Sequence, residues 1–489
     1  MSTGRPTPRE LALRFNELIR PTLTGQPRDT PVVLFIGGQP GAGKTTVQSA
    51  VLGRMGRKQA FPLDGDDLVA LHPNYRQLQR ANDMAAAYRA SEDVGSWWPR
   101  AARLLRMQRL DVAVSAPLAG WEWANARFAD FKRAGYRTEV AFVPTPEARS
   151  LQGIADRYQQ ARRPEVDRWG RWVLPEGHDI AYRGVLDTVD RIDAAVAVDA
   201  VHVVRRDGVI IHSNESVDGR WALGVATRQV IEGERSRVWT EAESGDFLHK
   251  QGSLRERTSP EWVPLLDEID RRALNGISPV AVLDDVQLNE QAVLVTRAHA
   301  AAVEAQERSQ ERSKELGERS RGGGNEVRLQ DLRARGASEQ QLDYARLRLD
   351  QTRWAAGLTA WSAGLDVGEL ASLDERLTSE RARRVGLRPE DRAAEQAGRE
   401  GHRVLRRAAG LREDLVLPEH QPVVIRRAST TDPGPARWDA APASGPAGSG
   451  ATPRAERSSA AGVAGVAGSS VPSLPPSRSR GSASAGAER

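Results

Sequence analysis

Gly38-Gln39-Pro40-Gly41-Ala42-Gly43-Lys44-Thr45 is the stretch that decides the fold of this 489-residue chain. It has the G-x-x-x-x-G-K-T spacing of a phosphate-binding loop (P-loop), between an apolar run at 32–36 and a stretch with helical spacing at 46–52. A strand, a glycine-rich turn and a helix in that order are the context that this motif requires. The stretch therefore predicts an α/β protein that binds the phosphates of a nucleotide.

Each residue type in the loop has a physical role in holding phosphate. Glycines let the backbone curl so that successive N–H groups point at phosphate oxygens, and the start of the following helix adds partial positive charge. Lys44 can reach the β- and γ-phosphates, and the Thr45 hydroxyl can ligate Mg²⁺. We therefore expect ATP, in preference to GTP, and Mg²⁺ as cofactors. The predicted nucleotide-binding residues are Gly38, Gln39, Pro40, Gly41, Ala42, Gly43, Lys44, Thr45 and Thr46.

The composition excludes several other kinds of site. Cysteine is absent, which rules out disulfides, thiolate metal sites and cysteine nucleophiles. No run of about 18 apolar residues occurs and the N-terminus lacks a signal-peptide core, so we expect a cytoplasmic protein without a membrane segment. The net charge of +5 is small beside 70 basic and 65 acidic residues, and it does not indicate a nucleic-acid partner.

Short apolar runs alternate with helical stretches through the first half of the chain. A helix near 9–19 and a connector fill residues 1–30, ahead of a P-loop kinase-like domain that we expect to span 31–214. Strands separated by helices form a parallel sheet with helices on both faces. The predicted strands are 32–37, 60–63, 111–115, 138–143 and 201–205, and the predicted helices lie near 44–54, 97–109, 121–134, 146–162 and 178–192.

The chain changes character after Asn214. Residues 215–427 keep apolar positions at helical spacing among many charges, and they predict a mainly α-helical region of unknown role, broken by the glycines at 322–324. Ala, Gly, Ser and Pro dominate residues 428–489. Such a tail buries too little apolar surface to offset its chain entropy, so we predict that it is disordered.

Acidic residues after the second apolar run are candidate catalytic groups. Phosphoryl transfer to a hydroxyl needs a carboxylate that takes the hydroxyl's proton, and Asp64 and Asp66 would end a strand beside the P-loop. An Asp-rich turn or helix cap is the alternative interpretation. The third run ends in Ser115, where motor ATPases usually hold Mg²⁺ through an Asp, so a small-molecule kinase is favoured over a motor.

Arginines at 157–171 are candidates for stabilising the transferred phosphoryl group. On a segment over the nucleotide they would neutralise the charge that develops during transfer. In a chain with so many arginines, an ordinary arginine-rich helix face is the alternative.

Taken together, these elements resemble the zeta toxin family of P-loop phosphotransferases over about residues 31–214. The resemblance rests on the P-loop, Asp64-Gly65-Asp66, His72-Pro73-Asn74-Tyr75, Ala134-Gly135-Tyr136, Arg157-Tyr158, Arg171, His178-Asp179 and Val203-Val204-Arg205-Arg206-Asp207-Gly208. It implies a kinase that phosphorylates the 3′-hydroxyl of UDP-N-acetylglucosamine, and a small antitoxin protein that holds the enzyme inactive.

The resemblance also implies a role for individual residues. Asp66 matches the carboxylate that activates the sugar hydroxyl, while Lys44 and Thr45 match the phosphate and Mg²⁺ contacts. Arg157 and Arg171 match the arginines that grip the triphosphate and stabilise its transfer. The expected catalytic residues are thus Asp66, Lys44, Arg157 and Arg171.

Two stretches depart from the family pattern on the sugar side of the site. Ser115-Ala116-Pro117 stands where the family often has an acidic residue, Gly and Thr, and proline offers neither a hydroxyl nor an N–H. The preceding helix lacks a glutamate that would match a substrate contact of the family. Trp97-Trp98-Pro99-Arg100 stands there instead, and Trp97 and Trp98 could line the acceptor cleft. Two alternatives stay open: a kinase of another small-molecule hydroxyl, or a nucleotide-dependent module whose residues 215–427 bind a protein partner.

Overall fold

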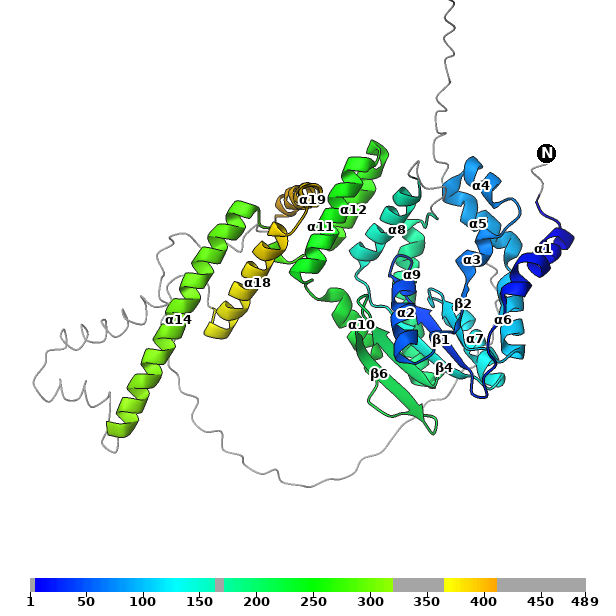
Figure 1. The fold of residues 1–489 in the computed structure, drawn as a ribbon, viewed down its shortest axis with the longest axis horizontal. Coiled ribbons are helices and arrows are strands. Elements are labelled where there is room, and N and C mark those ends of the chain that lie inside the picture. Colours follow the sequence, from blue (N-terminus) through cyan, green and yellow to red (C-terminus); the bar gives the residue numbers. More distant parts are fainter. Residues whose placement is uncertain (1–4, 163–170, 320–364, 411–489) are drawn as a thin grey trace, which may run out of the picture. The chain divides into compact units, whose positions relative to one another are not determined.

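The computed structural model describes residues 5–162, 171–319 and 365–410. Within these ranges, seven strands form one sheet in the order β2-β3-β1-β4-β5-β6-β7 (Figure 1). The predicted glycine break at 322–324 and the predicted tail at 428–489 lie outside the described residues. None of the helices described is long and apolar enough to cross a membrane.

The parallel strands stand at the positions that the apolar pattern predicts. They are β1 (Val32–Gly37), β2 (Phe61–Asp64), β3 (Val112–Ser115), β4 (Arg137–Phe142) and β5 (Ala200–Val204). β1 pairs in parallel with β3 on one side and with β4 on the other. All residues of β1 are buried, as expected for a central strand that helices cover on both sides.

Helices cover both faces of the sheet, which confirms the predicted α/β class. Side chains alternate across a strand, so Leu34 and Ile36 of β1 pack on the helix after the P-loop, whereas Val33 and Phe35 join a larger core on the opposite face. The first helix is α2 (Lys44–Arg54), and the opposite core includes α6 (Trp97–Met107), α7 (Trp121–Arg133) and α9 (Pro175–Ala195).

The N-terminal segment packs on this larger core. α1 (Pro8–Arg14) continues through a π-helical turn, η1 (Phe15–Ile19), into a 3-10 turn, η2 (Arg20–Thr22). Phe15 is fully buried, with its ring centroid 6.4 Å from that of Trp97. Trp97 is therefore a core residue, and neither Trp97 nor Trp98 lines the cavity described below, so their interpretation as acceptor-cleft walls is wrong.

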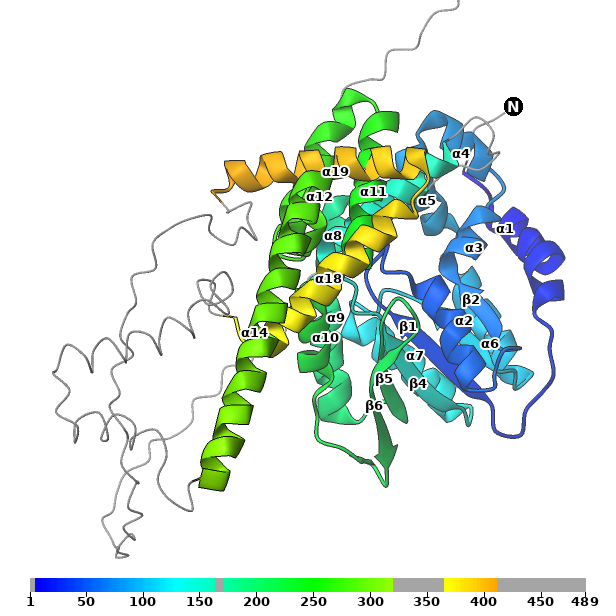
Figure 2. The ribbon, with the colours of Figure 1, turned by 60° about the vertical axis from the view of Figure 1, so that its left-hand side comes forward.

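The far edge of the sheet differs from the prediction of a purely parallel sheet. β6 (Ile210–Val217) pairs antiparallel with β5, and β7 (Arg220–Trp221) pairs antiparallel with β6 (Figure 2). The reversal between β5 and β6 uses Gly208, whose φ of +84° suits glycine. Because β6 is only partly buried, its sequence lacks the long apolar run that marks the buried strands. The sheet therefore extends past the expected boundary at 214.

Short helices that the sequence did not predict fill residues 65–94. They are α3 (Gly65–Ala70), α4 (Tyr75–Ala81) and α5 (Asp83–Val94). The His72-Pro73-Asn74-Tyr75 motif makes the turn between α3 and α4. His72 is buried there: its Nδ1 accepts the Asn74 N–H at 3.1 Å, and its Nε2 lies 3.1 Å from an Asp93 oxygen. This motif thus has a structural role and stays outside the cavity.

Beyond the sheet the described residues are helical, as predicted. The helices are α10 (Thr227–Ser236), α11 (Glu241–Arg257), η3 (Pro260–Trp262), α12 (Val263–Ala273), α13 (Pro279–Val282), α14 (Asp285–Arg319), α18 (Val367–Val385) and α19 (Pro389–Ala408). Phe247 and Leu248 of α11 are fully buried in a core shared with α8 (Glu147–Ala161) and α12. The helical region therefore packs directly on the sheet domain.

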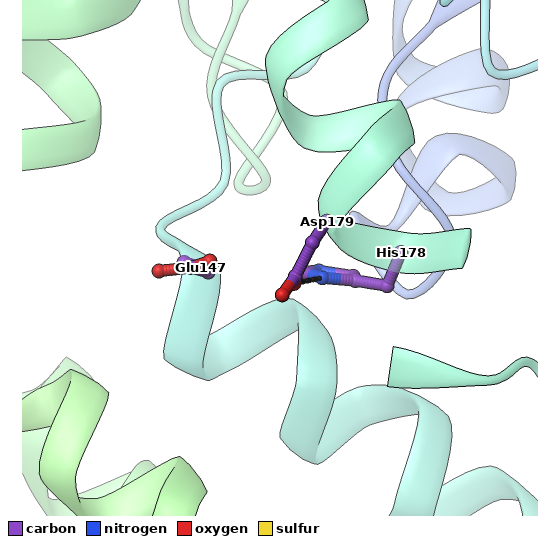
Figure 3. Close-up of side chains that lie close together, drawn as sticks. All are labelled: Glu147, His178 and Asp179. Atoms are coloured by element: carbon purple, nitrogen blue, oxygen red, sulfur yellow. Dashed lines mark hydrogen bonds and ion pairs between the residues drawn. The ribbon is translucent and has the colours of Figure 1, made fainter. Parts of the chain in front are cut away.

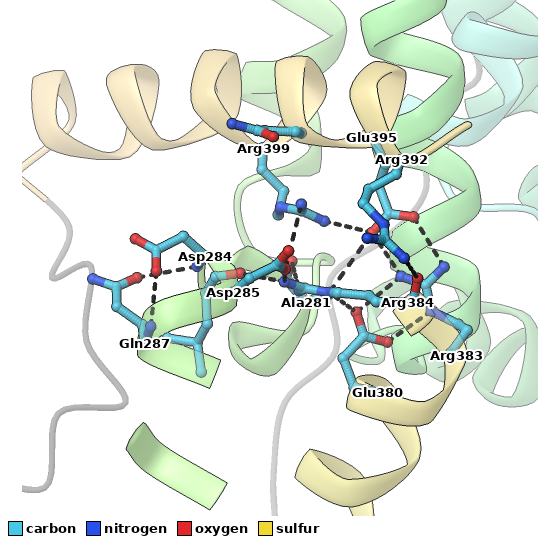
Figure 4. Close-up of polar contacts among 12 residues, drawn as sticks. Ala281, Asp284, Asp285, Gln287, Glu380, Arg383, Arg384, Arg392, Glu395 and Arg399 are labelled. Carbon is cyan, nitrogen blue, oxygen red and sulfur yellow. Dashed lines mark hydrogen bonds and ion pairs between the residues drawn. The ribbon is translucent and has the colours of Figure 1, made fainter. Parts of the chain in front are cut away.

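A buried network of charges joins α18, α19 and the start of α14 (Figure 4). Arg384 donates to the Leu283 carbonyl at 2.8 Å and pairs with Asp285 and Glu380 at 2.9 and 2.8 Å. Arg399 pairs with Glu395 at 2.6 Å. Apart from the half-exposed Asp285, these charges are buried and each faces an opposite charge. Losing one buried partner would therefore leave an uncompensated charge in the interior.

Candidate active site

A cavity of about 370 Å³ lies at the carboxyl ends of β1, β2 and β3. This is where open α/β sheets bind their ligands. Among the described residues more basic than acidic side chains line it, which suits an anionic ligand such as a triphosphate. The basic ones are Lys44, Arg149, Arg157, Arg171, Arg206 and Lys250, and the acidic ones are Asp64, Asp66, Asp156 and Asp246. All four residues expected to be catalytic thus meet in one cavity.

Glycines of the P-loop adopt backbone conformations that other residues rarely take. Gly41 and Gly43 have φ of +77° and +91°. A Cβ on Gly41 would lie 2.0 Å from the Ser150 carbonyl oxygen of α8, so the loop packs directly on that helix. Lys44 donates from Nζ to the Gly38 carbonyl at 2.8 Å, and burial lowers its pKa to about 8. The Lys44 ammonium is therefore held inside the loop, where a bound phosphate would replace the Gly38 carbonyl as its hydrogen-bond acceptor.

The predicted nucleotide-binding residues divide into two groups. Pro40, Gly41, Gly43, Lys44, Thr45 and Thr46 line the cavity, whereas Gly38, Gln39 and Ala42 lie behind it. The Gln39 side chain is fully buried and donates to the Thr145 carbonyl at 2.7 Å and to the Ser150 hydroxyl at 3.1 Å. Its oxygen accepts from Arg235 of α10 at 3.3 Å. The Gln39 side chain thus braces the loop from behind instead of contacting a nucleotide.

Asp64 and Asp66 occupy different depths of the cavity. Asp64 caps α3 by accepting the Asp66 N–H at 2.8 Å, and burial raises the pKa of its carboxyl while nearby Lys44 opposes that change. Asp66, on the first turn of α3, is about half exposed and forms an ion pair with Arg171. Asp64 is thus a helix cap, as the alternative interpretation predicts. Asp66 is a half-exposed carboxylate that lines the cavity, and its catalytic role stays a prediction.

The departure at Ser115-Ala116-Pro117 forms one wall of the cavity. The Pro117 carbonyl accepts the Gly38 N–H at 3.2 Å, and the Ser115 side chain opposes the rise in the pKa of Asp64. This segment therefore supports the P-loop and Asp64 while offering the cavity little side-chain polarity beyond one hydroxyl.

Sequence reasoning missed several residues of the cavity. Arg206 stands in the turn after β5, and Arg149, Gln152 and Asp156 follow one face of α8. The helical spacing of the three α8 residues is visible in the sequence. Nothing in the sequence, however, distinguishes these cavity residues from other polar residues on the surface. Asp246 and Lys250 come from α11, in the region to which the sequence assigned no role.

The donor atoms around the P-loop fit Mg²⁺. The Thr45 hydroxyl and the Asp64 carboxylate offer oxygen ligands in the cavity, which is the ligand type that this ion prefers. When bound with a nucleotide, Mg²⁺ would neutralise charge on the β- and γ-phosphates.

A second group of candidate metal ligands, Glu147, His178 and Asp179, has another explanation (Figure 3). Arg272 of α12 pairs with Glu147 at 2.6 Å and with Asp179 at 2.7 Å. His178 lies 2.9 Å from Asp179 through Nδ1 and 2.7 Å from the Ser150 hydroxyl through Nε2, and burial lowers its pKa. With its ligand atoms engaged in this way, the group acts as a brace between the helical region and α8.

A parallel sheet with a P-loop, an opposing carboxylate and converging arginines defines a P-loop phosphotransferase. The family model for the zeta toxin matches residues 19–216, which form a domain of the zeta toxin family. The match covers the sheet from β1 to β6 and includes each residue expected to be catalytic.

Relatives are distant in sequence. The chain is 21% identical over 212 residues to Toxin PezT of Streptococcus pneumoniae, covering 42% of this chain and 81% of the relative. It is 19% identical over 209 residues to Toxin zeta of Streptococcus pyogenes, covering 42% and 72%. A solved structure from the PezAT toxin–antitoxin system of Streptococcus pneumoniae matches with a TM-score of 0.44 and 17% identity, over 51% of this chain and 98% of that one.

Proposed function

We propose that this protein is an ATP-dependent kinase that transfers the γ-phosphate to the 3′-hydroxyl of UDP-N-acetylglucosamine. The observation that supports it best is the meeting of Lys44, Arg157, Arg171 and Asp66 in one cavity. A protein that only binds nucleotide needs the lysine but has no use for a carboxylate at the acceptor side. The sugar nucleotide itself is what the family resemblance implies.

In this reaction the acceptor oxygen attacks the γ-phosphorus, the bond to the ADP oxygen breaks, and the hydroxyl proton passes to Asp66. Lys44 and the P-loop hold the β- and γ-phosphates, while Arg157 from α8 neutralises charge on the transferred group. Arg171 pairs with Asp66 in the present structure. For Asp66 to take the proton, Arg171 must turn from that carboxylate to the phosphate. Nucleotide binding would thus free the Asp66 carboxylate from Arg171, so that it can act as the general base.

A second candidate exists for the identity of the acceptor. Ser115 and Pro117 line the cavity where the family often has an acidic residue and Thr, so another small-molecule hydroxyl is the second candidate. We also propose an antitoxin protein as a partner, as the family resemblance implies. A module that binds nucleotide without catalysis is disfavoured because Asp66, Arg157 and Arg171 converge.

Mass spectrometry of the products tests this proposal. The full-length chain would be incubated with Mg²⁺, ATP and UDP-N-acetylglucosamine, beside the variants Asp66→Asn and Asp67→Asn. Asp67 is exposed and lies outside the cavity, so it is a matched control. We expect one added phosphate on the sugar nucleotide, lost by about 10²–10⁴-fold in Asp66→Asn and kept in Asp67→Asn. ATP binding without sugar phosphorylation would contradict the acceptor, and equal activity of the two variants would contradict the role of Asp66.

A further inference from the structure

One wall of the cavity is built by a helix that lies outside the zeta toxin domain. α11 begins at Glu241, beyond the matched residues 19–216, yet its Asp246 and Lys250 line the same cavity as the P-loop. Such a helix could border the cavity without a role, or it could form part of the nucleotide site. Its packing and its charges favour the second.

α11 is fixed on α8 by both apolar and polar contacts. Phe247 and Leu248 are fully buried, directly beside Asp246 in the sequence. Gln152 of α8 donates from Nε2 to the Phe247 carbonyl at 2.8 Å, and Arg149 pairs with Glu243 at 2.8 Å. Because α8 also carries Arg157, the two helices together hold Asp246 at a set distance from the phosphate side of the cavity.

Charged side chains divide the cavity into two ends. The charges of Asp64, Arg157 and Arg171 affect the pKa of Lys44, so these three residues lie with Lys44 at the phosphate side of the cavity. The pKa of Arg206 is affected instead by the charges of Arg149, Asp246 and Asp156. The γ-phosphate belongs beside Lys44 and Asp66, so the second group of charges faces the other end of the nucleotide.

Arg206 links this second end to the P-loop. Its Nε lies 3.0 Å from where a Cβ on Gly43 would stand, so the side chain extends over the loop next to the start of α2. The backbone at the start of that helix cradles the α- and β-phosphates in P-loop proteins. A nucleotide that lies along the loop from Lys44 past Arg206 would therefore bring its nucleoside to α11.

We propose that Asp246 of α11 hydrogen-bonds the nucleoside of the bound nucleotide, so that the helical region completes the kinase site. A carboxylate only accepts hydrogen bonds, so its partners are ribose hydroxyls or N–H groups of the base, and not the phosphates. Lys250 pairs with Asp246 at 2.8 Å and holds the carboxylate in place, while the half-exposed Asp246 keeps room for a ligand. This inference rests on the proposed function, since it assigns a contact within that same site.

Calorimetric titration of the full-length chain separates the nucleoside from the phosphates. The ligands are Mg²⁺ complexes of ATP, GTP and inorganic tripolyphosphate, which offers the phosphates alone. The variants are Asp246→Ala and, as a control on the same helix, Glu256→Ala, because Glu256 is exposed and outside the cavity. The readout is the ratio of ATP affinity to tripolyphosphate affinity. Most of the effect of removing one negative charge cancels in this ratio, because both ligands are polyanions whose total charges differ by one.

We expect that ratio to fall about tenfold or more in Asp246→Ala and to stay unchanged in Glu256→Ala. An equal fall for GTP would place the contact on the ribose, and a fall for ATP alone would place it on the base; both support the inference. An unchanged ratio would overturn it, even if both affinities dropped together, and would leave the kinase proposal intact. A wild-type chain that binds tripolyphosphate no more weakly than ATP would also overturn it. If the ratio falls in Asp246→Ala but the wild-type chain does not phosphorylate UDP-N-acetylglucosamine, only the proposed acceptor is contradicted.

Discussion

The crossing of α11 and α19 makes a specific prediction about glycine. A Cβ on Gly252 would lie 1.8 Å from the Ala394 carbonyl oxygen, and one on Gly398 would lie 1.9 Å from the Leu248 carbonyl oxygen. Ordinary C···O contacts are about 3.3 Å or longer, so Gly252→Ala must push the helices apart by roughly 1.5 Å. The same contact shows why neither position of this crossing accepts a side chain.

The size of the effect comes from two opposing free energies. Overpacking at a close contact costs about 1–3 kcal/mol, whereas Ala is favoured over Gly inside a helix by about 1 kcal/mol. Gly233 is exposed on α10, and no atom lies within 4 Å of a Cβ added there. Gly233→Ala should therefore show only the stabilisation that Ala gives over Gly in a helix. We therefore expect Gly252→Ala to be less stable than Gly233→Ala by about 1–3 kcal/mol, which is roughly 2–12 °C in melting temperature.

Thermal and urea unfolding of the full-length variants, followed by circular dichroism, would measure this gap. The comparison uses the same substitution in both helices, so differences in side-chain chemistry cancel. If Gly252→Ala were as stable as Gly233→Ala, the close crossing of α11 and α19 would be refuted. The wild-type chain should fall between the two variants or match Gly252→Ala.

Two further predictions concern charges. Because burial lowers the pKa of Lys44 to about 8 and a bound phosphate favours the charged ammonium, ATP binding should take up a proton above pH 8. The affinity for ATP should then fall by up to about tenfold per pH unit above pH 8. Calorimetric titrations in buffers of different ionisation enthalpy would measure the proton uptake, and Lys44→Met should remove this pH dependence. No proton uptake at pH 9 would contradict the prediction. Arg272→Met leaves Glu147 and Asp179 without their shared partner and should cost about 1–3 kcal/mol in unfolding experiments. Arg271→Met, which breaks an exposed ion pair, should cost less than about 1 kcal/mol, and equal costs would argue against the brace.

The parallel sheet and the phosphate side of the site were predictable because their patterns are local. A buried strand, a glycine-rich turn and a helix follow one another within residues 32–54, and each requires its residue types whatever surrounds it. The placement of Asp66 beside the loop followed from the rule that parallel strands end at the same edge. The roles of Asp66, Arg157 and Arg171 in catalysis stay predictions that the proposed assays would test.

Other parts of the fold carry weaker local patterns. β6 is half-exposed and mostly polar, α3 and α4 are short, and the apolar positions of α5 are mostly alanines, so periodicity does not reveal these elements. Gln39 belongs to the loop motif by sequence, but only the packing of α8 and α10 turns its side chain away from the cavity. Trp97 likewise became a core residue because Phe15 lies against it.

The sequence by itself determined that this chain has a P-loop, a parallel sheet and a pair of aspartates at a strand end beside that loop, because each of these features has a recognisable local pattern. Only the tertiary structure decided that Arg206, Asp246 and Lys250 share the cavity with Lys44. Their positions depend on how α11 packs on α8, and this packing joins segments about 90 residues apart through buried contacts such as that of Gln152 with Phe247. A long-range contact of this kind leaves no spacing to recognise in a single sequence, since any exposed charge on a helix looks the same until its neighbours are known.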